Sequence, residues 1–195
     1  MPIFVISGPS GVGKTTLVDA FLKNNNFNIE RVVTYTTRSP RPSEIDGVQY
    51  HFIDKKAFEQ KIQKGEFLEY SSSYDAFYGT SIDIVEQERA GHSFILVADL
   101  SGSIAIKRAI SKAILIWLLP PSMHKLHDRL SNRTGSTTEL VQKRMLIAYN
   151  ELFSINQLIE FDYRIIADQI DCSLQKLVQI IKQSFVFSAQ NDKKL

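Results

Sequence analysis

The residues with the clearest chemical potential lie near the N-terminus, in the run Gly8-Pro-Ser-Gly-Val-Gly-Lys-Thr15. This run fits G-x-x-x-x-G-K-[ST] at every fixed position, a pattern typical of loops that bind nucleotide phosphates. Glycines let the backbone wrap closely round a phosphate, successive N–H groups point at the anion, and the lysine reaches the β and γ oxygens. The Thr15 hydroxyl can ligate Mg²⁺. The predicted nucleotide site comprises Gly8, Pro9, Ser10, Gly11, Val12, Gly13, Lys14, Thr15 and Thr16.

A second charged group lies between residues 34 and 80. Arg38 and Arg41 stand three residues apart, and Pro40 and Pro42 stiffen the loop that carries them. Two guanidinium groups with tyrosines nearby can hold a dianionic phosphate through charged and neutral donors together. The stretch therefore predicts a clamp for a second phosphate. The alternative for each arginine taken singly is an ordinary solvated basic loop.

Further cations stand later in the chain, at Arg129, Arg133 and Arg144. Phosphoryl transfer needs positive charge placed around the moving group rather than covalent chemistry. The segment 129–138 lies between two predicted helices, where a closing lid would bring Arg133 over the phosphates and exclude water. The alternative is that these arginines are solvated helix and loop charges.

Asp99 directly follows an apolar run, residues 94–98, that we expect to be a buried strand. Ligands of open α/β sheets bind at the carboxyl ends of the strands, so Asp99 is a candidate for a contact with Mg²⁺ through water or with a base. The alternative is a helix-capping role before Ser101-Gly102.

Four short apolar runs predict the strands that position these groups: residues 3–7, 94–98, 114–119 and 163–166. Helical periodicity separates them, first over residues 14–23, a run that the turn-prone Asn24-Asn-Asn26 ends. Strands that alternate with helices predict an α/β fold, a parallel sheet flanked by helices of the phosphate-loop NTPase type.

Two of the helices have marked ends. A helix over residues 55–64 has Asp54 placed to cap its start and Gly65 placed to end it. A longer helix begins at the capping-box pattern Ser136-Thr-Thr-Glu139. It then carries an apolar stripe on one face. The stripe comprises Val141, Met145, Ala148, Leu152, Ile155 and Ile159.

Residues 31–80 break the strand–helix rhythm, which predicts an inserted subdomain within one compact domain of residues 1–195. The core would comprise about residues 1–30 and 81–187, with the lid at about 129–138. Net charge of +2, from 23 basic and 21 acidic residues, is too balanced to indicate a nucleic-acid partner. The single cysteine, and a first apolar run too short to be a signal peptide or a spanning helix, favour a cytoplasmic protein without a membrane partner. We expect a monomer or a homodimer.

The insert also contains sequence motifs that resemble those of a known protein family, and this resemblance suggests roles for the residues described above. It reads Thr34-Tyr-Thr-Thr-Arg38-Ser-Pro-Arg41-Pro-Ser-Glu44-Ile-Asp-Gly-Val-Gln-Tyr50-His-Phe52, then Gly65-Glu-Phe-Leu-Glu69, then Tyr78-Gly-Thr80. This resembles the guanylate kinase family, with TTRxPRxGExDGxxYxF, GEFLE and YG[ST], from about residue 3 to about residue 181. The resemblance implies phosphoryl transfer from Mg²⁺-bound ATP to GMP, and also to dGMP.

The resemblance further implies roles for individual residues. Arg38, Arg41, Tyr50 and Tyr78 would hold the GMP phosphate, and Thr34, Glu69, Thr80 and Asp99 would contact the base. Lys14, Arg38, Arg133 and Arg144 would be the catalytic cations. The base assignment has independent chemistry behind it, because a carboxylate only accepts hydrogen bonds and guanine presents an N1–H and an amine where adenine presents an acceptor.

The chain departs from the family at several positions. Val97 stands where an acid is usual, Ser101 replaces a glutamine, Ala167 replaces an adenine-side asparagine, and the lid reads Arg133-Thr-Gly instead of Arg-Gly-Thr. One alternative is a guanylate-kinase-like interaction domain that binds phosphorylated partners, although such domains usually lack a working phosphate loop. Another is a kinase for a different small phosphate, which would leave Glu69 without a purpose.

Overall fold

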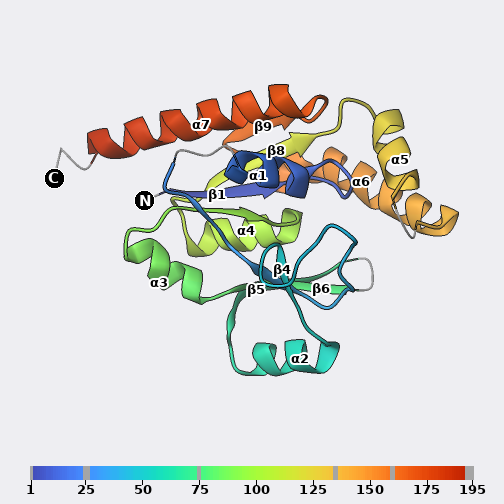
Figure 1. The fold of residues 1–195 in the computed structure, drawn as a ribbon, viewed down its shortest axis with the longest axis horizontal. Helices are drawn as coiled ribbons and strands as arrows, with labels where there is room; N and C mark the ends of the chain where they lie inside the picture. Colours follow the sequence, from blue (N-terminus) through green and yellow to red (C-terminus); the bar gives the residue numbers. More distant parts are fainter. Residues whose placement is uncertain (1, 24–26, 74–75, 134–135, 159–160, 192–195) are drawn as a thin grey trace.

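Two β-sheets organise the chain, one above the other in Figure 1. The computed structural model describes residues 2–23, 27–73, 76–133, 136–158 and 161–191. Residues 24–26, predicted to end the first helix, and Ile159 of the predicted stripe lie outside these ranges, and the side chain of Ile155 is likewise not described.

The main sheet has five parallel strands in the order β2-β7-β1-β8-β9. Their bounds are β1 Ile3–Ser7, β2 Glu30–Arg31, β7 Phe94–Val97, β8 Ile114–Leu119 and β9 Tyr163–Ile166. All five residues of β1 are buried, because helices cover both faces of the sheet; this explains its continuous apolar run. The four predicted strands are confirmed, except that β7 ends at Val97, one residue before the predicted end. The two-residue edge strand β2 is too short to leave a sequence pattern.

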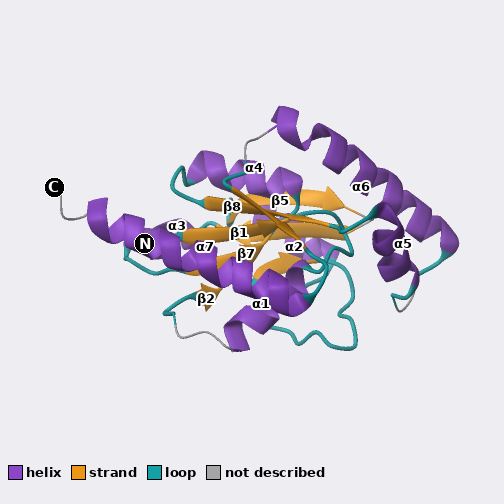
Figure 2. Cartoon of the chain, turned by 90° about the horizontal axis from the view of Figure 1, so that it is seen from above, coloured by secondary structure: helices purple, strands orange, loops and turns teal. Residues whose placement is uncertain are grey.

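Helices cover both faces of the main sheet (Figures 1 and 2), and alternate residues of β1 pack against different helices. Phe4 and Ile6 face α1 (Lys14–Lys23) and α7 (Ile170–Asn191), whereas Ile3 and Val5 share a core with α4 (Leu100–Ala109). Because β7 and β8 lie on opposite sides of β1, the loop after β1 stands where the strand order reverses, the usual ligand position in such sheets.

The second sheet has the order β4-β3-β6-β5. Its strands are β3 Thr34–Thr36, β4 Tyr50–Phe52, β5 Phe67–Ser73 and β6 Ala76–Ser81, and the associated helices are α2 Lys55–Gln63 and α3 Asp83–Arg89. The side chain of Asp54 accepts from the Ala57 N–H at 2.7 Å, and Gly65 follows α2 with a φ of +68°. Both predicted ends of this helix are confirmed.

A pair of helices, α5 (Met123–Ser131) and α6 (Thr138–Leu158), stands beside the first loop. The predicted cap of α6 is wrong by one residue: Thr137, not Ser136, accepts from the Leu140 N–H at 3.2 Å. Thr and Ser have the same capping chemistry, so the sequence pattern alone could not choose between them. No helix among the described residues is both long enough and apolar enough to cross a membrane.

A cavity shared by the phosphate loop and the second sheet

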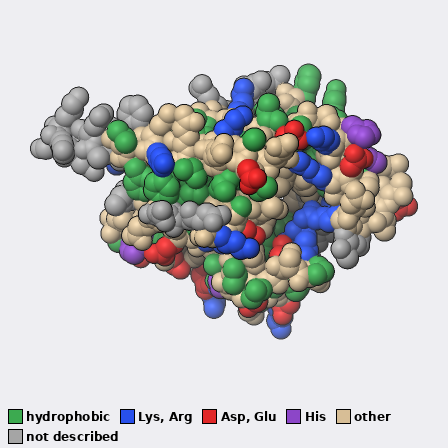
Figure 3. All heavy atoms as spheres, turned by 45° about the horizontal axis from the view of Figure 1, so that its top comes forward, with side chains coloured by type: hydrophobic (Ala, Val, Ile, Leu, Met, Phe, Trp, Pro, Cys, Tyr) green, Lys and Arg blue, Asp and Glu red, His purple; other side chains and the backbone are tan. Residues whose placement is uncertain are grey.

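A cavity of about 650 Å³ opens between the carboxyl ends of the main strands and the second sheet. Its size suits a small-molecule site. Lys and Arg side chains gather around a hollow on this side of the molecule (Figure 3). The structure brings most predicted site residues to this cavity: Gly8, Ser10, Gly11, Gly13, Lys14, Thr15, Thr16, Thr34, Arg38, Arg41, Tyr50, Glu69, Tyr78, Thr80, Asp99, Arg129, Arg133 and Arg144. Pro9 and Val12 are not among its lining residues.

The loop after β1 is held by close packing against the core. Gly8 has a φ of +140°, and a Cβ placed on it would stand 2.6 Å from the carbonyl oxygen of Leu118 in the neighbouring strand, so only glycine fits. Val12 is buried in the core, which explains its absence from the cavity. The loop therefore presents backbone and the N-terminus of α1 to the cavity, a geometry suited to an anion.

Lys14 extends along this loop and donates to the carbonyl oxygens of Gly8 and, at 3.1 Å, Pro9. Burial lowers its pKa to about 8, while the carboxylates of Glu151 and Asp99 act to raise it. An ammonium that desolvation disfavours gains when an anionic ligand arrives beside it.

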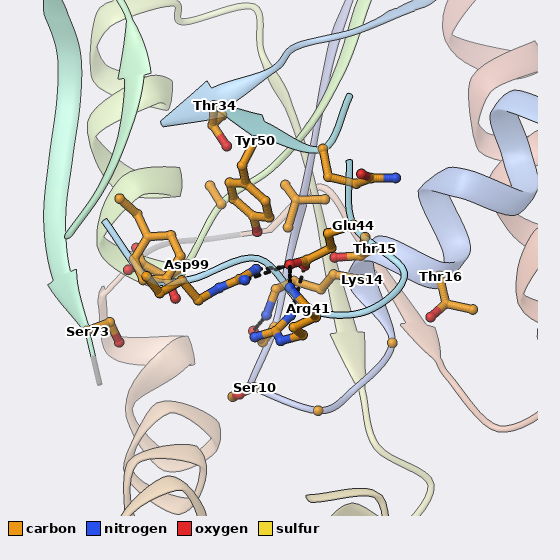
Figure 4. A pocket seen from close by; sticks show the side chains of 18 of the residues that line it. Ser10, Lys14, Thr15, Thr16, Thr34, Arg41, Glu44, Tyr50, Ser73 and Asp99 are labelled. Carbon is orange, nitrogen blue, oxygen red and sulfur yellow. Dashed lines mark hydrogen bonds and ion pairs between the residues drawn. The ribbon is translucent and has the colours of Figure 1, made fainter. Parts of the chain in front are cut away.

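On the opposite side, Arg38 and Arg41 converge on one carboxylate, Glu44. Figure 4 shows Arg41 beside Glu44 at the centre of the site. Arg38 donates to both oxygens of Glu44, at 2.6 and 2.7 Å, and Arg41 donates its side chain at 3.1 Å and its backbone N–H at 2.9 Å. The Glu44 side chain is only 4% exposed. Burial acts to raise the pKa of Glu44, but the bonds from the two arginines outweigh it and the pKa is lowered.

The guanidinium of Arg38 also lies over the ring of Tyr50, with Cζ 4.9 Å from the centroid. Its Nε is buried and has no hydrogen-bond partner among the described residues. Tyr50 and Tyr78 contact edge to face, with ring centroids 6.1 Å apart. Together these groups form a fixed cationic and hydroxyl surface with at least one donor not yet used.

A buried carboxylate occupies another wall of the cavity. Glu69 on β5 stands opposite Thr80 on β6, and the Thr80 hydroxyl donates to Glu69 Oε1 at 2.6 Å. The other oxygen lies against Gly102, where a Cβ would approach it to 2.9 Å. Burial raises the pKa of Glu69 to about 7, the Thr80 bond opposes this, and nearby Asp99 adds to it.

Asp99 has the capping role that the sequence left open. Its Oδ1 accepts from the Gly102 N–H at the start of α4 and from Ser101, both at 2.8 Å, and its Oδ2 accepts from Ser71 at 2.7 Å. Asp99 also lines the cavity. The aspartate is thus a cap and a cavity residue at once.

The three later arginines take different positions. The pKa of Arg133 is lowered to about 10 by burial and by neighbouring Arg41 and Arg144, so these cations crowd one region of the cavity. Arg129 instead donates to the carbonyl oxygens of Val12 and Asp168, each at 3.1 Å, and ties the phosphate loop to the segment after β9. Residues 134–135 of the predicted lid lie outside the described ranges.

Sequence reasoning assigned no role to Glu44, Ser71 and Glu151, all of which line the cavity. Glu44 stands inside the quoted motif, so its position three residues after Arg41 was an available signal. Glu151 follows Arg144 by seven residues, two helical turns, which places both on one face of α6. Nothing local in the sequence connects Ser71 with Asp99.

For a cation, the cavity offers oxygen ligands. No group of three or more His, Cys, Asp or Glu side chains suited to a metal occurs in the described part of the chain. Thr15 lines the cavity at the start of α1, and Mg²⁺ commonly binds one or two protein oxygens plus substrate phosphates and waters. The residues present therefore fit a Mg²⁺ ion that arrives with a nucleotide.

Comparison with known proteins identifies the family of this chain. The family model described as guanylate kinase matches residues 1–184. The guanylate kinase of Clostridium tetani is 38% identical over 92% of this chain and 84% of its own length, and that of Psychrobacter arcticus is 41% identical over 92% and 85%. The crystal structure of guanylate kinase from Anaplasma phagocytophilum superposes with a TM-score of 0.75, at 27% identity, over 93% of this chain and 84% of that one. With the phosphate loop, the arginine pair and the buried glutamate in one cavity, the chain belongs to the guanylate kinase family.

Proposed function

We propose that this chain transfers the γ-phosphoryl group of Mg²⁺-bound ATP to GMP, giving ADP and GDP. As a member of the guanylate kinase family it is an ATP-dependent nucleoside-monophosphate kinase. The observation that carries the choice of GMP is that a carboxylate that accepts hydrogen bonds when ionised, Glu69, shares a cavity with both the phosphate loop and the arginine pair. That arrangement can bind two nucleotides with their phosphates facing one another.

At the donor side, the loop from Gly8 to Thr15 holds the ATP phosphates through backbone N–H groups and the N-terminus of α1. Lys14 leaves the carbonyl oxygens of Gly8 and Pro9 and moves to the phosphates, where its charge offsets that of the transferred group. Mg²⁺, with Thr15 as its protein ligand, would neutralise charge on the β and γ phosphates.

At the acceptor side, Arg38, Arg41, Tyr50 and Tyr78 hold the GMP phosphate. Glu44 keeps the two guanidinium groups together, so little side-chain entropy is lost when the phosphate binds. Glu69 accepts from guanine N1–H and the N2 amine, supported by Thr34, Thr80 and Asp99. Orienting the acceptor oxygen for in-line attack is the main catalytic task of such a site.

During transfer, Arg133 and Arg144 stabilise the charge that spreads over the moving phosphoryl group. The segment around residues 129–138 closes over the phosphates and keeps out water that would hydrolyse ATP. We further propose that the insert and the lid act within one domain, that dGMP is also accepted, and that the protein works in the cytoplasm as a monomer or homodimer.

A coupled assay tests the proposal directly. Purified protein with ATP and Mg²⁺ is offered GMP, dGMP, AMP, UMP and CMP in turn, and ADP release is followed. We expect GMP to give the highest kcat/KM and AMP, UMP and CMP to give little turnover. A protein that prefers AMP, or that ignores all five acceptors while still binding ATP, would contradict the proposal.

A further inference from the structure

Among the described residues, five carboxylates line the cavity, and they differ in whether each has a hydrogen-bond partner. Four of them have described partners: Asp19 with Arg31, Glu44 with two arginines, Glu69 with Thr80, and Asp99 with Ser71, Ser101 and Gly102. The fifth, Glu151, has a buried Oε2 atom with no hydrogen-bond partner among the described residues. A buried carboxylate oxygen without a partner is costly, and an oxygen of this kind indicates a ligand that completes it.

The position of Glu151 narrows what that ligand can be. It projects from the same face of α6 as Arg144, two turns away, with buried Ala148 between them. Lys14 and Asp99 are the charged groups that act on it, so it stands near the phosphate-loop lysine. Glu151 lines the cavity together with the phosphate-loop residues and also borders a smaller hollow beside Ser73 and Asp99.

The described groups around Glu151 do not donate a hydrogen bond to its Oε2 atom. The Lys14 ammonium donates to the carbonyl oxygens of Gly8 and Pro9. The strand residue at the same end of the cavity, Val97, is apolar and supplies no acid. Burial raises the pKa of the Glu151 carboxyl, and the charge of Lys14 only partly opposes that rise. A positively charged group with hydrogen-bond donors would complete the site.

We propose that Glu151 is a positioning residue for the divalent cation carried by ATP: its Oε2 accepts from water bound to that cation, while Thr15 is the direct protein ligand. The inference rests on the proposed function, because it concerns the same Mg²⁺-bound donor. It differs from a role in holding Lys14, since it concerns metal-dependent affinity and not the affinity for phosphate alone. Water-mediated contact suits Mg²⁺, which gives up its waters reluctantly.

The test is the metal dependence of ATP binding, measured by isothermal titration calorimetry without any acceptor. The quantity is the ratio of the Kd for ATP in EDTA to the Kd for ATP in excess Mg²⁺. We expect Glu151→Gln to reduce this ratio about tenfold and Glu151→Ala to reduce it further, as outer-sphere changes at metal sites do. The Kd in EDTA should stay within about twofold of the parent. Glu139→Gln removes the same charge from an exposed site on the same helix and should leave the ratio unchanged.

Thermal melting of the nucleotide-free variants shows whether Glu151 instead stabilises the folded protein. Because Oε2 has no partner, Glu151→Gln should not lower the Tm, whereas the Tm increase caused by Mg²⁺ and ATP should shrink. A lowered Tm in the free protein, or equal weakening with and without Mg²⁺, would overturn the inference. So would an unchanged metal ratio with an altered GMP to dGMP preference, which would assign Glu151 to the ribose. A further outcome is that the parent protein phosphorylates GMP while both variants show the same ratio of ATP Kd values as the parent. That result would contradict this inference alone and would leave the proposed function intact.

Discussion

The phosphate loop and the second sheet bind by different means. The loop presents backbone groups whose geometry is held by close packing, as the approach of Gly8 to the carbonyl oxygen of Leu118 illustrates. The second sheet presents side chains held by hydrogen bonds and ion pairs, with Glu44 between two arginines and Glu69 on Thr80. Backbone N–H groups do not titrate, so within the loop it is Lys14, with its pKa of about 8, that responds to pH. A site built from paired charges depends on each partner and on its ionisation.

This contrast predicts that changes at the loop act on turnover and changes at the second sheet act on GMP. The largest effect is expected for Lys14→Met, which keeps side-chain length but removes the charge that the transferred group requires. Turnover should fall about 10² to 10³-fold, while KM for GMP changes little. Steady-state kinetics on protein of unchanged circular dichroism checks this. A folded variant within a few-fold of the parent would remove Lys14 from the mechanism.

Glu44→Gln tests whether the arginines need their shared carboxylate. Without it, Arg38 and Arg41 become neighbouring cations in a partly buried site and should separate. We expect KM for GMP to rise ten- to a hundredfold and KM for ATP to stay within about twofold, since losing one partner of a buried pair typically costs 3–5 kcal/mol and part of that falls on stability. Glu59→Gln, an exposed acid on α2, is the matched control. Equal increases for both substrates would indicate general loss of structure.

Glu69→Ala sharpens the comparison within the second sheet, because it addresses the base and not the phosphate. Loss of the acceptor leaves guanine donors unpaired, at about 1–3 kcal/mol, so the ratio of GMP to AMP efficiency should fall about ten- to a hundredfold. AMP should lose nothing. The measurement is kcat/KM for both nucleotides at saturating ATP. An unchanged ratio would place base recognition elsewhere, with Asp99 and Thr34 the next residues to test.

The smallest expected effect is on pH. Glu69 must be ionised to accept from guanine, and its pKa is about 7, so kcat/KM for GMP should fall about threefold between pH 7.5 and pH 6.5. In the protein without nucleotide, the raised pKa makes stability change with pH in the opposite direction. The folded state holds the proton more tightly than the unfolded state, so the free energy of unfolding falls as pH rises from about 4.5 to about 7. Glu69→Gln should lose both dependences, and the titration of Lys14 and of the GMP phosphate then accounts for the pH dependence that remains.

Much of the ATP-binding half could be predicted from the sequence, because its parts follow one another in the chain. A strand, a glycine-rich loop and a helix follow one another within residues 3–23, and each is marked by local composition. The caps of α2 were readable for the same reason, as Asp54 and Gly65 act within one turn of the helix they bound. The α6 cap was displaced by one residue because its neighbours have equivalent chemistry.

The GMP-binding half, built on the second sheet, depends on contacts between residues far apart in the sequence. Its arrangement could therefore be seen only in the tertiary structure. The Ser71 hydroxyl donates to Asp99 across 28 positions, and the Thr36 hydroxyl donates to the carbonyl oxygen of Phe77 across 41. Resemblance identified Glu69 and the arginines, and the spacing of Glu44 from Arg41 was a local signal for their ion pair. No local pattern indicated that Glu151 would enter the same cavity with an oxygen that lacks a partner among the described residues. By itself, the sequence determined the phosphate loop and the strand–helix order, because short-range periodicity and backbone conformation specify them. Only the fold decided which charges are buried and which of them lack a partner, because burial and pairing arise when segments far apart in the chain pack together.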